Sequence, residues 1–487
     1  MNFSPSDIYS LFRPSKCERR VFLQAHNEPE AELSDFDKLI QELGQRHEAN
    51  HLSTFHKYKD LRGGNLDERA AKTLKAIEEG ADVIYQGVFQ SNLPGSDDKV
   101  IGIPDFLIKD GDGYKIRDCK LSRHVDEGRH EEIILQLELY GWLFEQNVRT
   151  PPTALEVYLG DESIAQIIYR GGSVALEVLN QIRMLSQRPE EPYSPVGWSK
   201  CQGCGFRERC WKIAEEMNDV ALVFGVDQGL AIALKQQGVI SIKDFLKRFD
   251  SHSLDVLKKP HGKKLVRVGA AAGRILLQAE ALQTRKEKLL HPLTLPDAKN
   301  MVMFDLEGLP PQFDEIDKIY LWGTQVYGKR PGKFIAALAG FGEGGDREGW
   351  EQFLENCRVI FRDYGKIPYI HWANYETTKV NSYISRYGDR DGIAERVLEN
   401  CVDLLKITRD ALVLPEYSYS LKVIENRTGF KRSLEEAGGQ WSIVQYIRAV
   451  ETKNEKLRKE IMDQILKYNE EDLKATWAVL KWLESHN

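Results

Sequence analysis

The sequence predicts a multidomain α/β protein, and three observations lead to that prediction. The chain has 487 residues, 42% hydrophobic and 29% charged, which is typical of folded domains and enough for two or three of them. Strand-like runs mix with helical patterns in both outer parts, whereas the middle is almost wholly helical in pattern. The proline-containing segments RPEEPYSP and HPLTLPDAKN separate these parts. We therefore expect three domains, over residues 1–217, 218–292 and 299–487.

Charge, hydropathy and cysteine content exclude several classes of protein. No window approaches 18 uninterrupted apolar residues, and the N-terminus lacks the apolar core of a signal peptide, so we expect a cytoplasmic protein without a membrane partner. The net charge of -7 disfavours a protein that coats nucleic acid non-specifically. Seven cysteines in such a protein do not suggest disulfides, so clustered ones indicate metal ligands or redox groups first.

The first candidate site lies in the segment IPDFLIKDGDGYKIRDCK. Two apolar runs flank the sequence DGDG, whose Asp-Gly pairs favour a tight hairpin turn. A hairpin centred there places Asp105 opposite Asp118, with Lys120 two residues on and on the same face. Two such carboxylates repel unless a divalent cation lies between them, and the ammonium can orient the attacking water. The triad indicates phosphodiester hydrolysis; the alternative is an exposed hairpin with ordinary surface charges.

Three further polar residues accompany this hairpin. His47 lies in the helical pattern FDKLIQELGQRHEANHL, and Gln136 and Tyr140 share one face of the helical pattern EEIILQLELYGWLF. Each of them alone is more often structural than catalytic. The joint order of His, Asp, Asp-x-Lys and Gln-x-x-x-Tyr resembles the RecB-like branch of the PD-(D/E)XK nuclease superfamily, which has a restriction-endonuclease-like core.

The resemblance implies a role for each of these residues. Lys120 would assist the nucleophile, and Gln136 and Tyr140 would contact substrate or support the site. Many members of the family carry Glu where this chain has Asp118, and the shorter arm can change the metal preference. The implied ligands of one or two Mg²⁺ or Mn²⁺ ions are His47, Asp105 and Asp118.

Four cysteines form a second candidate metal site. Cys201, Cys204 and Cys210 stand in a C-x₂-C-x₅-C pattern, and Cys17 can supply a fourth ligand from the other end of the same domain. Four thiolates accept zinc or an iron–sulfur cluster, and spacing does not separate the two. The framing of Cys17 resembles the iron–sulfur-bearing RecB-like nucleases, including the CRISPR-associated type, which implies a [4Fe-4S] cluster with zinc as the alternative. The other cysteines stand alone in apolar contexts: Cys119, Cys357 and Cys401.

The middle of the chain resembles a small all-α helix-hairpin-helix module. Two short helical patterns flank a turn at Gly238, and a second glycine-containing turn, RVGAAAGRI, follows. Such a turn exposes backbone N–H groups that bind a DNA phosphate without reading a base. Lys263 and Lys264 lie in the basic stretch nearby, so we expect Gly238 and these lysines to contact nucleic acid. The alternative is a helical spacer with a solvated basic loop.

The last candidate site begins in the strand-like run MVMFDLEG. Asp305 and Glu307 alternate onto one face of that strand and can share a metal ion. Two more strand-like runs, a long helical pattern and the strand-like IPYIHWA follow, which is the ribonuclease-H-like order. Near the end of the chain, Tyr468 and Asp472 stand four apart on one helical face. An ordinary charged helix face is the alternative interpretation of that pair.

These residues resemble the Tyr-bearing subgroup of the DEDD 3′-exonucleases. The resemblance implies that Tyr468 positions water and that Asp472 completes a two-metal cage with Asp305 and Glu307. The second acidic motif of the family usually has Asp, where this chain offers Glu376 in HWANYETTKV. We expect Glu376 to take that role, because Asp403 begins an apolar run and can simply cap it.

The whole chain resembles a bacterial family of RecB-like nucleases that join an iron–sulfur nuclease domain, a helix-hairpin-helix linker and a ribonuclease-H-like domain. The resemblance implies a metal-dependent nuclease with two active sites, and we expect it to degrade DNA from single-stranded ends. Two alternatives stay open: processing of RNA or RNA–DNA hybrids by the C-terminal site, and a non-catalytic iron–sulfur protein that binds nucleic acid. A protein partner such as a helicase is also left open.

Overall fold

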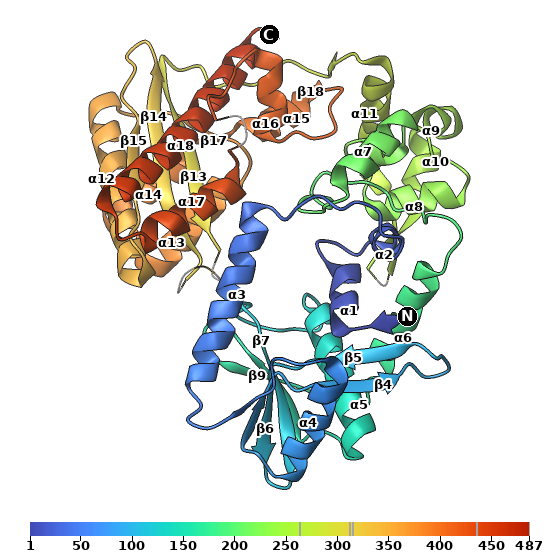
Figure 1. Ribbon diagram of the computed structural model, residues 1–487. Coiled ribbons are helices and arrows are strands. Elements are labelled where there is room, and N and C mark those ends of the chain that lie inside the picture. Colours follow the sequence, from blue (N-terminus) through green and yellow to red (C-terminus); the bar gives the residue numbers. More distant parts are fainter. Residues whose placement is uncertain (263, 311–312, 314–315, 435–436, 487) are drawn as a thin grey trace. The chain divides into compact units, whose positions relative to one another are not determined.

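The computed structural model describes residues 1–262, 264–310, 313, 316–434 and 437–486 (Figure 1). The chain divides into two compact units, Met1–Trp211 and Lys212–Asn487. Among the residues described, there is no helix long and apolar enough to cross a membrane.

A six-stranded mixed sheet, in the order β2-β3-β6-β7-β8-β9, forms the centre of the first unit. A smaller sheet, in the order β1-β5-β4, lies beside α5 in the same unit. The strands are β1 Asn2–Phe3, β2 Lys59–Asp60, β3 Val83–Tyr85, β4 Phe89–Asn92, β5 Lys99–Gly102, β6 Phe106–Asp110, β7 Gly113–Cys119, β8 Ala154–Tyr158 and β9 Ile164–Ile167. The helices are α1 Pro5–Phe12, α2 Glu18–Ala25, α3 Asp35–Ser53, α4 Leu66–Glu78, α5 Glu131–Val148, α6 Ser173–Ser186 and α7 Arg207–Glu216.

The two faces of the main sheet pack against different helices. Tyr114 and Ile116 of β7 share a core with α5, whereas Phe106 of β6 packs near the end of α3. Because side chains alternate along a strand, Asp118 lies on the same face of β7 as Tyr114 and Ile116. The alternation therefore directs this carboxylate toward the α5 side of the sheet.

The hairpin between β6 and β7 has the predicted register. Phe106 pairs with Arg117, and the ladder continues to the pair of Asp110 and Gly113. The turn uses Gly111 at φ 59°, in the left-handed region that favours glycine. The predicted alignment of Asp105 with Asp118 is therefore confirmed, although Asp105 itself precedes the first residue of β6.

The middle of the chain departs from the predicted all-α module. Its helices are α8 Gln228–Gln236, α9 Ile242–Arg248, α10 Ser251–Asp255 and α11 Ala272–Thr284. The stretch expected to be helical also contains an antiparallel hairpin of two short strands, β10 Lys258–His261 and β11 Lys264–Arg267. The all-α prediction is therefore wrong here, because the basic stretch pairs with itself and packs on α8. Gly229 of α8 lies so close to this hairpin that a Cβ would come 2.0 Å from the carbonyl oxygen of Pro260.

The rest of the second unit contains a five-stranded sheet in the order β15-β14-β13-β16-β17. The first three strands form an antiparallel meander, and β16 and β17 continue the sheet in parallel with β13, as the sequence predicted. The strands are β12 Lys288–Leu289, β13 Asn300–Leu309, β14 Lys318–Gly328, β15 Ile335–Leu338, β16 Tyr369–His371, β17 Cys401–Asp403 and β18 Leu412–Val413. The helices are α12 Gly342–Tyr364, α13 Tyr375–Tyr387, α14 Ile393–Glu399, α15 Leu404–Ala411, α16 Leu421–Ile424, α17 Gly439–Glu451 and α18 Glu455–Glu484.

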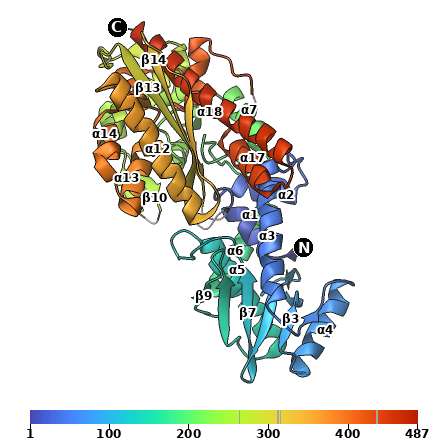
Figure 2. The same cartoon turned by 90° about the vertical axis from the view of Figure 1, so that its left-hand side faces the viewer.

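Helices cover both faces of this sheet, with α12, α13 and α14 on one side and α18 on the other (Figure 2). Val302 and Phe304 of β13 pack in the core with α12, whereas Met301 and Met303 pack with α18. Strand alternation therefore places Asp305 and Glu307 on the α18 face of β13.

Candidate nuclease sites

In the first unit, a lysine and two aspartates converge at the end of the β6–β7 hairpin. Lys120 Nζ forms an ion pair with Asp118 Oδ2, and the backbone N–H of Cys119 donates to Asp105 Oδ2 at 2.8 Å. Burial and the charge of Asp118 raise the pKa of Asp105 well above its usual value. Burial lowers the pKa of Lys120, but the two aspartates outweigh it and raise that pKa, so Lys120 stays protonated. The three groups predicted from the hairpin are brought together.

Three residues that the sequence patterns did not indicate belong to the same network. Gln86 Nε2 donates to Glu48 Oε1 at 2.7 Å and to Asp105 Oδ1 at 3.1 Å, and the Tyr85 hydroxyl donates to Glu48 at 2.9 Å. Gln86 has φ 56°, a left-handed conformation that costs a non-glycine residue on the order of 1 kcal/mol. The sequence signal for Glu48 was its position next to His47, whereas Gln86 stands in a loop with no pattern around it.

His47 packs against Tyr158, which pairs with Cys119 between Asp118 and Lys120. Its Nε2 lies 3.3 Å from the carbonyl oxygen of Tyr158, and its ring stacks on the Tyr158 ring with 4.9 Å between centroids. On α5, Gln136 Nε2 donates to the Tyr140 hydroxyl at 3.2 Å, so the predicted i, i+4 pair does share a helix face. Burial and the charge of Asp118 raise the pKa of Tyr140 well above its usual value.

The four predicted cysteine ligands line one small cavity in the first unit. Cys17 precedes α2, Cys201 and Cys204 lie in the loop before α7, and Cys210 lies within α7. The apolar packing around them comes from Phe22, Leu23 and Phe206. The donor set is four half-buried thiols around a common space, which fits either a tetrathiolate zinc ion or an iron–sulfur cluster.

In the second unit, three carboxylates from two elements meet. Asp305 and Glu307 on β13 and Asp472 on α18 offer oxygen atoms that all lie within 4.8 Å of one another. Burial, followed by the charges of Asp472 and Glu307, raises the pKa of Asp305 well above its usual value. Burial and the charge of Asp472 raise the pKa of Glu307 to about 8. Such a set of hard oxygen donors with mutual repulsion fits Mg²⁺ or Mn²⁺.

Asn469 holds one of these carboxylates in place and was not among the predicted residues. Its Nδ2 donates to Asp305 Oδ2 at 2.7 Å, and its side chain is fully buried. Gly323 stands opposite Asp305 on β14, and a Cβ there would come 1.7 Å from Asn469 Oδ1. The glycine is therefore required for the amide to approach the strand. Position 469 lies three residues before Asp472, so helical spacing was the signal that could have found it.

Tyr468 and Arg432 complete the surroundings of Asp472. Burial and the charge of Asp472 raise the pKa of Tyr468 well above its usual value, so this phenol keeps its proton. Arg432 Nη2 donates to Asp472 Oδ1 at 2.6 Å and also to Glu425 Oε2 at 2.6 Å. Arg432 is 40 residues from Asp472 along the chain, and no motif around it indicated that it belongs to the site.

Glu376 pairs with a histidine and is not part of the group formed by the three carboxylates. His371 Nδ1 lies 3.4 Å from Glu376 Oε2, and both side chains are buried. Burial lowers the pKa of His371, but hydrogen bonds with Cys401 and Glu376 outweigh it and raise the pKa to about 10. The charge of Glu376 still contributes to the raised pKa of Asp305. Asp403 caps α15 by accepting from the Lys406 backbone N–H at 2.9 Å, as predicted.

Two of the three predicted nucleic-acid contacts of the middle segment, Gly238 and Lys264, lie on its surface. Gly238 is exposed in the turn between α8 and α9, with φ 75°, so the predicted pair of short helices around this turn is confirmed. Lys264 is exposed in β11. Lys263 lies outside the described residues.

Comparison with known families assigns both outer parts of the chain. Residues 18–211 match the PD-(D/E)XK nuclease superfamily, and residues 302–484 match the RNase H superfamily. The chain therefore contains one domain of each class, and both classes point to a nuclease. No curated protein matches the chain significantly. A solved structure titled "Crystal structure of SSO0001" aligns with 36% of this chain and 96% of its own, at 15% identity and a TM-score of 0.20.

Proposed function

We propose that this protein is a metal-dependent nuclease that degrades DNA from single-stranded ends and has two active sites. The observation that carries the proposal is the meeting of Asp305, Glu307 and Asp472 within 4.8 Å in an RNase H-superfamily domain. The three-domain division at residues 1–217, 218–292 and 299–487 is part of the proposal, with the middle segment as a helix-hairpin-helix-like linker.

At the C-terminal site, the four proposed ligands of Mg²⁺ or Mn²⁺ are Asp305, Glu307, Glu376 and Asp472. Ions held there would bind the phosphate oxygens and lower the pKa of the attacking water. Asn469 orients Asp305, and the neutral Tyr468 phenol orients the water by a hydrogen bond. Arg432 offsets part of the carboxylate charge and keeps Asp472 in position.

At the N-terminal site, the proposed ligands of the same ions are His47, Asp105 and Asp118. Lys120, protonated beside Asp118, stabilises charge that develops on the phosphate. Gln136 and Tyr140 support the site from α5 or contact substrate. Glu48 joins this network through Gln86, so we include it among the positioning residues.

The four cysteines are proposed to hold a [4Fe-4S] cluster, with zinc as the alternative. Cys17 comes from the start of the first unit and the other three from its end, so a bound cluster would join the two ends of that domain. Gly238, Lys263 and Lys264 are proposed to contact the nucleic-acid backbone, which requires no base recognition.

The test is anaerobic digestion of matched single- and double-stranded DNA and RNA, labelled at the 5′ or the 3′ end, with Mg²⁺ or Mn²⁺. We expect progressive release of short products from single-stranded DNA and little cleavage of RNA. Preferred digestion of RNA or of RNA–DNA hybrids would replace the proposed substrate. Binding of all substrates without cleavage under either metal would contradict the nuclease proposal itself.

A further inference from the structure

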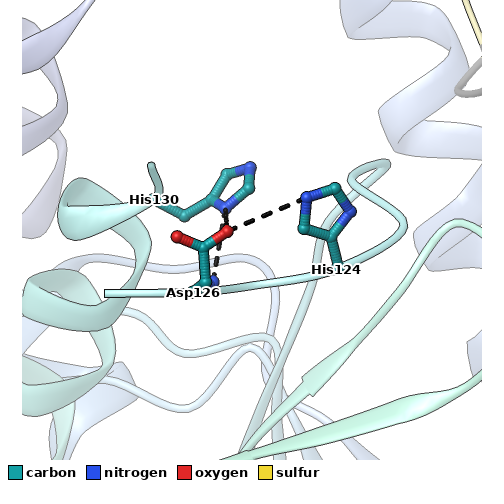
Figure 3. Close-up of side chains that lie close together, drawn as sticks. All are labelled: His124, Asp126 and His130. Atoms are coloured by element: carbon teal, nitrogen blue, oxygen red, sulfur yellow. Dashed lines mark hydrogen bonds and ion pairs between the residues drawn. The ribbon is translucent and has the colours of Figure 1, made fainter. Parts of the chain in front are cut away.

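Two histidines and an aspartate form a separate cluster in the loop between β7 and α5. His124, Asp126 and His130 offer ligand atoms that all lie within 4.8 Å of one another. His124 Nε2 lies 3.8 Å and His130 Nδ1 lies 3.7 Å from the same atom, Asp126 Oδ2. Figure 3 shows both rings beside that carboxylate, each with a nitrogen directed toward it.

The backbone of the loop brings these three side chains together. The N–H of His130 donates to the carbonyl oxygen of Asp126 at 3.0 Å, which closes one helical turn and places both side chains on the same face. The N–H of Gly128 donates to Asp126 Oδ1 at 2.9 Å, so the other oxygen is left toward the imidazoles. The loop is also held from outside, because the N–H of Gly160 donates to the carbonyl oxygen of Ser122 at 3.0 Å.

Hydrogen bonds around His130 favour the tautomer that a metal ion requires. The Ser122 hydroxyl donates to the carbonyl oxygen of His124 at 2.7 Å, so its oxygen is free to accept. His130 Nε2 lies 3.4 Å from the Ser122 hydroxyl oxygen, which places the ring proton on Nε2. Nδ1 then accepts the backbone N–H of Asp126 at 3.4 Å, and a bound ion would replace this long hydrogen bond. A polar partner on the second nitrogen is the usual support of a metal-binding histidine.

We propose that His124, Asp126 and His130 bind a divalent transition-metal ion, for which Zn²⁺ is the probe. Two imidazoles and one carboxylate suit such an ion better than Mg²⁺, which prefers oxygen ligands. In a tetrahedral site with Zn–N bonds of about 2.0–2.1 Å, two ligand atoms lie roughly 3.4 Å apart. The ligand atoms of the three side chains therefore need to move only slightly closer together. His124 is able to move in this way, because its side chain is 63% exposed.

Metal binding by His124, Asp126 and His130 does not require the proposed nuclease function. The loop that contains them leads from Lys120 to α5, which carries Gln136 and Tyr140. A bound ion would therefore fix the loop that joins two parts of the N-terminal site, without contributing to the carboxylate metal centres.

The test is the number of Zn²⁺ equivalents that the full chain binds, measured by calorimetry in excess Mg²⁺ so that the carboxylate sites are occupied. We expect His124→Ala and Asp126→Ala to bind one equivalent fewer than wild type, and the exposed-histidine control His56→Ala to bind the same number. The cysteines are unchanged in all variants, so their contribution cancels. Ring ¹⁵N spectra of histidine-labelled wild type should show Zn²⁺-dependent shifts of His124 and His130. Equal equivalents in every variant, or ring signals that do not move, would overturn the proposal.

Discussion

The two carboxylate sites differ in where their compensating cation comes from. In the first unit, Lys120 pairs with Asp118 two residues earlier in the chain, so one hairpin supplies both charges. In the second unit, β13 and α18 supply three carboxylates, and Arg432, which pairs with Asp472, is shared with Glu425. The N-terminal site therefore has its cation and its carboxylates in one short sequence motif. The C-terminal site is assembled from distant segments and holds more uncompensated negative charge, so its structure and activity should depend more strongly on bound metal.

Backbone strain accompanies both sites. Gln86, which donates to Asp105, has φ 56°, and Ala373, next to the His371–Glu376 pair, has φ 76°. Non-glycine residues in this region cost on the order of 1 kcal/mol or more and persist where the surrounding contacts enforce them. In each domain one of the residues with such a φ therefore lies beside a carboxylate of the candidate site.

The largest expected effect is at the metal-dependent C-terminal site. Asp305→Asn removes one of the three clustered carboxylates and should slow cleavage by that site about 10³-fold. This is the size of effect expected when one preorganised electrostatic group is lost. Rates on end-labelled DNA measure the loss. Asp463→Asn, an exposed aspartate on α18, is the matched control and should keep wild-type rates. Near-normal cleavage in Asp305→Asn would remove this carboxylate from the chemistry.

The second-largest effect is expected at the N-terminal site, where Lys120 belongs to the same hairpin motif as the aspartates. Lys120→Ala should slow cleavage by that site about 10²-fold, because charge on the phosphate loses its compensation. The measurement is the rate at which the N-terminal site releases its products, followed in the Asp305→Asn background, where the C-terminal site is impaired. Lys109→Ala, on the neighbouring strand and exposed, serves as the control. If Lys120→Ala and Lys109→Ala give the same rate, Lys120 has no role in catalysis.

A smaller effect is expected at Asn469, which positions a proposed metal ligand but is not itself a ligand. Asn469→Ala leaves all carboxylates in place but frees Asp305, so the Mn²⁺ concentration that gives half-maximal activity should rise about 10- to 100-fold. Saturating Mn²⁺ should restore most of the rate. The exposed neighbour Gln464→Ala is expected to behave as wild type. A rate that stays low at every metal concentration would make Asn469 a participant in the chemistry instead.

The smallest effect concerns stability and pH in the absence of metal. Glu307 has a folded-state pKa of about 8 against an ordinary value of 4.5, so the folded state binds more protons than the unfolded state between these values. Rising pH across that window therefore opposes folding, and the melting temperature should fall, by about 2–4 °C for each 1 kcal/mol lost. Glu307→Gln should reduce this slope. A melting temperature that rises with pH to the same extent in both proteins would contradict the raised pKa.

Much of this arrangement could be predicted from the sequence, for physical reasons. The DGDG turn set the hairpin register, and strand alternation placed Asp305 and Glu307 on one face. The β10–β11 hairpin was missed because its short, basic strands bury little and carry no alternating pattern. Gln86 and Arg432 were missed because each reaches its site from a loop through tertiary packing, which no local period records.

The proposal that one chain carries two working nuclease sites has one direct test. The measurement compares the end-labelled DNA products of wild type, Lys120→Ala, Asp305→Ala and the double variant in Mn²⁺ under anaerobic conditions. We predict that each single variant loses a different set of products and that the double variant cuts nothing. If one single variant abolishes all cleavage while the other changes nothing, the chain has one active site, and the proposal of two is contradicted.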